Sequence, residues 1–185
     1  VFDKTCERSI ARGMRVTGSE LIGLVPKKVL IDAGKHFLKK QKRSTGISES
    51  EIIKIAIKTL GLDELATFNP EERIIEYMLD ADANKPLVNM SLTDFADETA
   101  SESPAPGGGS ISAYAGVMGI SLGTMVANLS AHKRGWDDRW EEFSDWAEKG
   151  MKYQNTLLDL VDEDTNAFNK IMDAFRLPKD TEESK

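Results

Sequence analysis

Residues 103–131 read SPAPGGGSISAYAGVMGISLGTMVANLSA and carry no formally charged side chain. A proline-rich loop passes into three glycines and then into a long run of small and apolar residues. A membrane-spanning helix needs about 20 predominantly apolar residues, whereas this run also contains serines, a threonine, an asparagine and further glycines. Gly119 and Gly123 would let neighbouring helices approach closely. We therefore expect a central helix packed among other helices, and no membrane span.

The composition of the chain is that of an ordinary folded protein. Its 185 residues are 40% hydrophobic and 30% charged, with a net charge of -7. This acidic balance, with no local basic patch in the sequence, predicts no nucleic-acid partner. The single cysteine, Cys6, cannot form an internal disulfide, and no signal peptide or cysteine framework is present. These features favour a cytoplasmic protein.

The residues before this run predict mainly helices. Apolar periodicity and capping residues favour helices near residues 2–12, 26–43, 48–61 and 69–78. Met14-Arg15-Val16 reads as a brief strand, and Leu21–Val25 as a buried strand or loop. The segment Asp80–Lys85 has almost no large apolar residue, so we interpret it as a linker between two modules.

The residues after the linker also predict helices. Ser91 resembles a helix start, and residues 137–175 predict a helix with aromatic anchors near its beginning. The fold class expected for the whole chain is therefore mostly α.

The loop at residues 104–110 is the first candidate functional site. Its members Gly107, Gly108, Gly109 and Ser110 lead into the apolar helix, and bare backbone N–H groups at a helix N-terminus favour a carboxylate or phosphate. The same loop could instead serve packing alone, with Ser110 as a helix cap. No lysine follows the glycines as it would in a P-loop, which excludes a nucleotide site of that kind.

Asp164 is the second candidate. It lies at helical spacing on a stripe that we expect to face the core, formed by Leu157, Val161, Phe168, Ile171 and Phe175. Burial of a carboxyl raises its pKa toward the range that suits proton transfer near neutral pH. The alternatives are a structural aspartate bonded to a neighbouring helix or one left in water. The nearby acids Asp159, Asp162, Glu163 and Asp173 are expected to face water.

The two histidines are weaker candidates. His36 has no acidic partner at close helical spacing except Asp32, so we expect a surface or half-buried side chain. His132 follows the uncharged helix, where the helix dipole favours a cation. With one cysteine and no paired histidines, the sequence predicts no metal site.

Several motifs in sequence order resemble the formimidoyltransferase-cyclodeaminase family, bifunctional folate enzymes of histidine degradation. The first part resembles the end of the formiminotransferase module at residues 16–26, 60–63 and 68–77. The second part resembles the start of the cyclodeaminase module at residues 104–110, 160–164, 167–168 and 177–179. The resemblance implies the end of an α/β formiminotransferase module at residues 1–43, a helical connector and linker at 44–90, and the first half of an all-α cyclodeaminase bundle at 91–185.

The resemblance also implies chemistry. Such enzymes transfer a formimino group from formiminoglutamate to tetrahydrofolate, the co-substrate, and then close the ring to methenyltetrahydrofolate with release of ammonia. In the matching motif, the residue at the position of the family's proposed acid/base is Asp164. The spacing of the apolar stripe selects the same residue independently. Residues Gly107 to Ser110 would help hold folate, whose glutamate carboxylates suit a helix N-terminus, and polyglutamylated folate is a possible ligand. His36 lies outside the family's catalytic-histidine motif and receives no role.

The family forms homo-oligomers, which we expect here too. Since the motifs span a domain junction, we also expect these residues to be a piece of a longer protein, inactive and prone to associate by themselves. Two alternatives remain open. A stand-alone cyclodeaminase or methenyltetrahydrofolate cyclohydrolase would leave residues 16–77 unexplained, and a non-catalytic helical oligomerisation module would need no folate.

Overall fold

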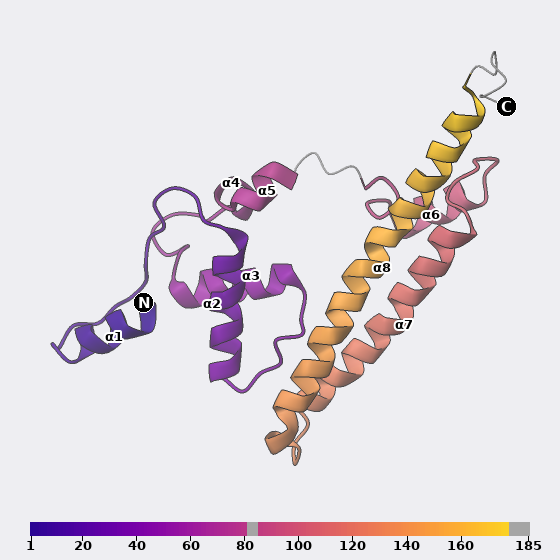
Figure 1. The fold of residues 1–185 in the computed structure, drawn as a ribbon. Coiled ribbons are helices and arrows are strands. Elements are labelled where there is room, and N and C mark those ends of the chain that lie inside the picture. The colour runs from indigo at the N-terminus through magenta and orange to yellow at the C-terminus, as the bar shows by residue number, and fades with distance from the viewer. Residues whose placement is uncertain (81–84, 178–185) are drawn as a thin grey trace. The chain divides into compact units, whose positions relative to one another are not determined.

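The computed structural model describes residues 1–80 and 85–177, and within them the chain is mostly helical (Figure 1). The helices are α1 (Phe2–Ile10), α2 (Lys27–Lys40), α3 (Glu49–Leu60), α4 (Pro70–Arg73), α5 (Ile75–Asp80), α6 (Leu92–Thr99), α7 (Gly108–Ala131), the 3-10 turn η1 (Asp137–Arg139) and α8 (Trp140–Phe175). The mostly α fold class is confirmed. Most of the predicted linker, residues 81–84, and the motif residues Pro178 and Lys179 lie outside the described residues.

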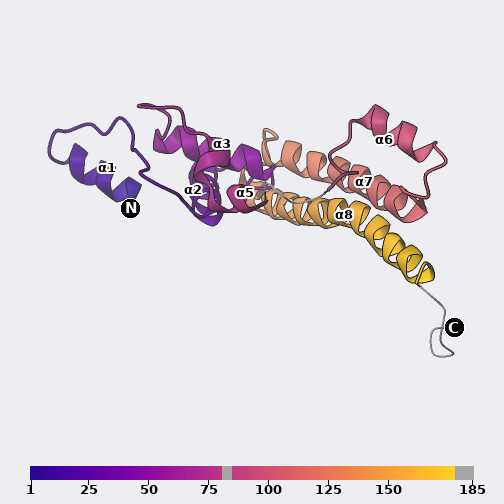
Figure 2. The same ribbon diagram turned by 90° about the horizontal axis from the view of Figure 1, so that it is seen from above.

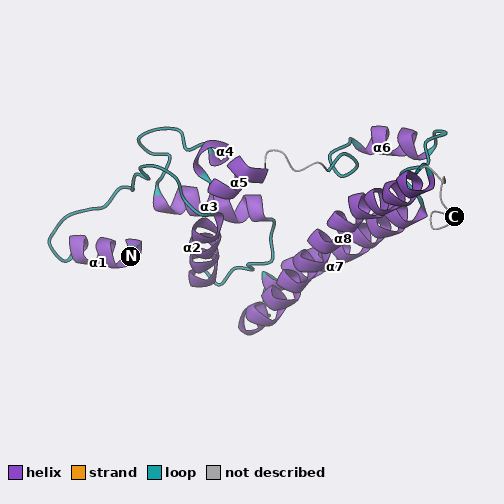
Figure 3. Cartoon of the chain, turned by 45° about the horizontal axis from the view of Figure 1, so that its top comes forward, coloured by secondary structure: helices purple, strands orange, loops and turns teal. Residues whose placement is uncertain are grey.

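No strand forms within the described ranges (Figure 3). The brief strand predicted at Met14–Val16 is wrong: the Met14 N–H donates to the Ser9 carbonyl at 2.9 Å in the turn after α1, and no described strand pairs with these residues. Leu21–Val25 is a loop in which Val25 forms an isolated parallel bridge with Ile74. The assignment of residues 1–43 to the end of an α/β module stays a prediction, and so do the boundaries between the three predicted segments.

The predicted helix boundaries rest on the capping residues that the sequence suggested. The side-chain oxygens of Ser48, Asn69 and Ser91 accept backbone N–H groups in the first turns of α3, α4 and α6. Gly61 ends α3 in the left-handed conformation, with φ of 65°. These signals are local, which is why they could be read without knowledge of the packing.

The chain divides into two compact units. The first comprises Val1–Ala83 with Ala127–Glu148, and the second comprises Asn84–Val126 with Lys149–Lys185. The helices α7 and α8 therefore contribute to both units.

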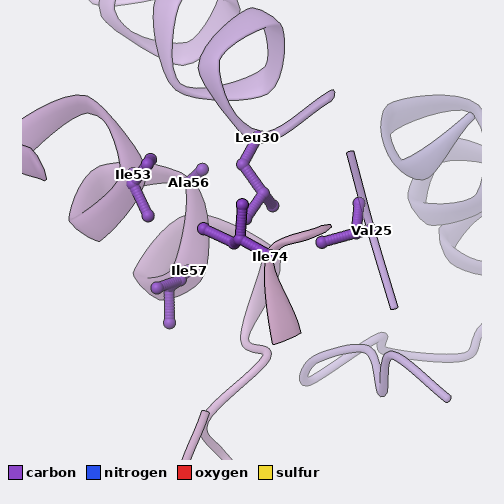
Figure 4. Close-up of a cluster of buried hydrophobic side chains, with 6 residues drawn as sticks. All are labelled: Val25, Leu30, Ile53, Ala56, Ile57 and Ile74. Atoms are coloured by element: carbon purple, nitrogen blue, oxygen red, sulfur yellow. The ribbon is translucent and has the colours of Figure 1, made fainter. Parts of the chain in front are cut away.

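The core of the first unit lies where α2 and α3 meet the loop before α2 and the turn before α5 (Figure 4). It consists of Val25, Leu30, Ile53, Ala56, Ile57 and Ile74. The Val25 N–H donates to the Arg73 carbonyl at 2.9 Å and the Ile75 N–H to the Val25 carbonyl at 3.1 Å. These bonds satisfy backbone groups at the core that would otherwise be buried unpaired.

Charged and aromatic contacts hold α1 against α2 in the first unit. Asp3 pairs with His36 at 2.9 Å and with Lys40 at 3.2 Å, and these partners hold the pKa of Asp3 below its usual value. Phe2 packs edge-on against Phe37, with ring centroids 6.5 Å apart. His36 is exposed, as predicted, but its acidic partner comes from another helix rather than from Asp32.

The second unit is built on the antiparallel pair of α7 and α8, which run side by side (Figure 2). Glycine allows the close approach: a Cβ atom on Gly150 would overlap Thr124, and one on Gly116 would lie 3.3 Å from Leu157. A Cβ atom on Gly119 or Gly123 would meet nothing within 4 Å. The expectation that these two glycines contact a neighbouring helix is therefore wrong for the described chain.

The far side of α7 is apolar and exposed. Met118, Leu122, Met125 and Val126 are about half exposed, at 53%, 59%, 49% and 58%. By length and composition α7 is able to cross a membrane, but the central helix of a water-soluble bundle passes the same test. The expected burial among several helices is met on one side only, and the absence of a membrane span stays a prediction.

Candidate active site at the start of helix α7

The second unit brings the two predicted site elements together. Asp164 on α8 lies beside the glycine loop at the start of α7. Its Oδ2 accepts the backbone N–H of Ser110 at 3.0 Å and lies 3.3 Å from the Ser110 hydroxyl. The carboxylate therefore satisfies one of the unpaired N–H groups of the first turn of α7, where the helix dipole favours a negative charge.

Ser110 is fully buried and holds this arrangement in place. Its hydroxyl donates to the Val161 carbonyl at 2.7 Å and lies 3.3 Å from the Thr165 hydroxyl. Because α7 already begins at Gly108, the alternative in which Ser110 caps its own helix is wrong. Asp164 of the partner helix supplies the cap instead.

The three glycines of the loop differ in what surrounds them. A Cβ atom on Gly109 would overlap the Asp164 carboxylate, and one on Gly107 would lie 3.9 Å from Oδ2. A Cβ atom on Gly108 would meet nothing within 4 Å. Gly109 is thus required for the approach of Asp164, whereas Gly108 faces open space where a ligand has room.

The exposure of Asp164 differs from the prediction. Its carboxylate is exposed, and the stripe residues Phe168 and Ile171 are 37% and 55% exposed. The predicted burial is not reached, although the start of α7 contacts Asp164. The stripe did identify the side of α8 that contacts α7, since Val161 and Asp164 both meet Ser110.

Asp162 is a site-forming residue that the sequence argument misplaced. It was expected to face water, but it is 5% exposed and accepts the Leu87 N–H at 2.9 Å and the Val88 N–H at 3.2 Å. The carboxylate thereby ties the segment before α6 to α8, two residues from Asp164. No local pattern signals this role, because the partners lie about 75 residues earlier in the chain.

The remaining polar groups of the site are backbone donors. The N–H groups of Gly108 and Gly109 have no acceptor in the part of the chain that the structure describes. No three His, Cys, Asp or Glu side chains gather as a metal site among residues 1–80 and 85–177. The site therefore offers an exposed carboxylate next to two free N–H donors, an arrangement that can bind a polar ligand and exchange a proton with it.

The described residues thus form an α-helical chain with an exposed carboxylate held at the N-terminus of a second helix. Residues 91–185 match the formiminotransferase-cyclodeaminase family, and residues 1–80 match the formiminotransferase domain. The chain belongs to the formiminotransferase-cyclodeaminase family.

Curated relatives carry the same two regions. A formimidoyltransferase-cyclodeaminase of Gallus gallus is 38% identical over 186 residues, covering 100% of this chain and 34% of the relative. One of Dictyostelium discoideum is 34% identical over 97% of this chain and 34% of the relative. A methenyltetrahydrofolate cyclohydrolase of Methylorubrum extorquens is 36% identical over 97 residues, or 52% of this chain and 47% of the relative. The chain thus spans about a third of the length of the bifunctional relatives.

Proposed function

We propose that this chain is part of a folate-dependent one-carbon enzyme of histidine degradation. The proposed activities are formimino transfer from formiminoglutamate to tetrahydrofolate and closure of formiminotetrahydrofolate to methenyltetrahydrofolate with release of ammonia. The family match supports both activities. The observation that supports the second most directly is the Asp164 carboxylate at the start of α7.

Asp164 is the acid/base of ring closure in this proposal. The folate amine attacks the carbon of the protonated formimino group (–CH=NH2+), a C–N bond forms, and the amine proton passes to the Asp164 carboxylate. The same carboxyl then returns the proton to the formimino nitrogen, whose bond to carbon breaks as ammonia leaves. The Ser110 N–H holds the carboxylate in position through both transfers.

Gly107, Gly108, Gly109 and Ser110 form the folate-contacting loop in this proposal. From the sequence, these four residues were expected to bind the glutamate carboxylates of folate. However, Asp164 already places a negative charge at this helix end. A second carboxylate there would be repelled. We therefore assign the free N–H groups of Gly108 and Gly109 to uncharged acceptor atoms of the folate, with Asp164 nearby as proton acceptor.

Replacement of Asp164 tests the assignment. In the full-length protein that contains these residues, Asp164→Asn should lower the rate of ring closure by about 100-fold or more. The rate is measured from the absorbance of the methenyltetrahydrofolate that forms. Glu163→Gln removes the neighbouring exposed carboxylate and should leave the rate within about twofold. An Asp164→Asn protein that keeps the full rate, with formimino transfer measured in parallel, would refute the role of Asp164.

A methenyltetrahydrofolate cyclohydrolase is the second candidate, favoured by the Methylorubrum extorquens relative. That relative matches about half of the chain, whereas the bifunctional relatives match all or nearly all of it. Hydrolysis of methenyltetrahydrofolate without ammonia release from formiminotetrahydrofolate would favour this candidate. We further propose a cytoplasmic, metal-free homo-oligomer, supported by the free Cys6 and the exposed apolar side of α7.

A further inference from the structure

A cavity of about 500 Å³ lies in the first unit, and none of its lining residues belongs to the proposed active site. The end of α2, one side of α3 and His132 after α7 form its walls. Leu38 and Ile55 contribute apolar surface, and the volume falls within the range of small-molecule sites.

Basic side chains gather around this cavity although the chain as a whole is acidic. Arg43, Lys54 and Lys58 line it together with a single carboxylate, Glu51. Lys54 and Lys58 lie four residues apart on α3 and so share a side of the helix. The sequence predicted no basic patch because Arg43 joins these lysines only through the packing of α2 on α3.

The cations differ in their present partners. Lys54 pairs with Glu51 at 2.6 Å, and Lys58 pairs with Asp63; all four are on the surface or partly exposed. Such exposed pairs contribute little free energy, so a bound anion can compete for the lysines. Arg43 makes no ion pair or side-chain hydrogen bond within residues 1–80 and 85–177.

Ser44 supplies an independent indication of the ligand's chemistry. It is 2% exposed and lines the cavity, and its oxygen accepts the Gly46 N–H at 3.2 Å. Its own O–H has no acceptor in the described part of the chain. A buried hydroxyl proton without an acceptor costs free energy. An oxygen atom of a ligand that accepted this proton in a hydrogen bond would remove the cost.

We propose that this cavity binds a small molecule that carries two or more phosphate or carboxylate groups. The Arg43 guanidinium would donate to one group in the two-pronged geometry that suits an oxyanion. The Ser44 hydroxyl would donate to the same group, and Lys54 and Lys58 would receive the second. His132, whose side chain makes no hydrogen bond or ion pair within residues 1–80 and 85–177, also lines the cavity.

Calorimetric titration of the complete chain with tripolyphosphate and with citrate tests the proposal. We expect saturable binding of one or both, and the preferred probe identifies phosphate or carboxylate as the recognised group. Arg43→Gln should weaken binding by about tenfold or more, since a charge-assisted hydrogen bond is lost. Ser44→Ala should weaken it less, and circular dichroism checks that both variants stay folded.

Two further variants act as controls. Arg12→Gln removes an arginine outside the cavity and should leave binding unchanged; a loss equal to that of Arg43→Gln would overturn the proposal in favour of nonspecific charge attraction. Asp164→Asn should also leave binding unchanged; tighter binding, as expected when a negative charge is removed from the start of α7, would place the anion at the other site and overturn the proposal. Absence of binding of both probes would overturn it too, without bearing on ring closure.

Discussion

At the scale of single residues, Asp164 and Gly109 depend on each other. The carboxylate reaches the first turn of α7 because Gly109 has no side chain, and the Ser110 N–H gains its acceptor only through that approach. Gly108, one residue earlier, carries no such constraint. Of these two adjacent glycines, Gly109 is required for the contact with Asp164, whereas Gly108 has room for a side chain.

Gly109→Ala should destabilise the protein because the new methyl group displaces Asp164 from the Ser110 N–H. The loss of a capping interaction costs about 1 kcal/mol, measured as the free energy of unfolding in urea. Gly108→Ala is the matched control and should be neutral or slightly stabilising, since alanine favours helix. Equal destabilisation by both changes would contradict the steric argument.

At the scale of elements, two carboxylates of α8, one buried and one half-buried, join segments that are distant in sequence. Asp162 of α8 accepts two backbone N–H groups from residues 87 and 88, and Glu148 of α8 accepts the Thr45 hydroxyl at 2.5 Å and Lys35 at 3.0 Å. In both cases an acid on α8 anchors a loop, one in each unit.

Asp162→Ala should release the segment before α6. The amides of Leu87 and Val88 lose their acceptor, so their hydrogen exchange should accelerate, and the free energy of unfolding should fall by about 1.5–3 kcal/mol. Asp159→Asn alters an exposed carboxylate that pairs with Lys85 and should leave both amides protected. Unchanged exchange in Asp162→Ala would show that other contacts hold the segment.

Glu148 predicts an acid-sensitive contact in the first unit. Burial by itself would raise the pKa of Glu148, but the hydrogen bonds from Thr45 and Lys35 outweigh it and hold the pKa below its ordinary value of 4.5. The ionised form therefore stabilises the fold above pH 4.5, and this contribution is lost as the pH falls through the lowered pKa. Glu148→Gln should lose less stability between pH 7 and pH 3 than the unsubstituted protein.

Urea unfolding at the two pH values measures this effect, and Glu102→Gln, in an exposed loop, is the control. It should retain the full acid sensitivity. If Glu148→Gln were as acid-sensitive as the control, the Glu148 contact would not contribute to the pH dependence.

At the scale of the whole molecule, the exposed apolar side of α7 should make the 185-residue chain associate. Light scattering after gel filtration should show assemblies larger than a monomer, and Leu122→Lys with Met125→Lys should shift them toward monomer. Ser112→Lys adds a positive charge at an exposed polar position of the same helix and should not. A monodisperse monomer of the unsubstituted chain would contradict this expectation.

The local features of this protein follow from short stretches of sequence. Ser48, Asn69 and Ser91 begin helices and Gly61 ends one through bonds that reach only two to four residues along the chain. The family motifs are local in the same sense. Asp164 and the glycine loop were each identified as candidates from the sequence, but their contact with each other was not predicted.

Burial and long-range contact were decided only by the tertiary structure. Asp162 is buried and Asp164 exposed, the reverse of the expectation, because helical periodicity ranks the sides of a helix without showing which of them another segment covers. Gly116, not Gly119 or Gly123, meets the neighbouring helix for the same reason. Arg43 joins Lys54 and Lys58 only after α2 packs on α3, so the basic cavity has no signature in the order of the residues.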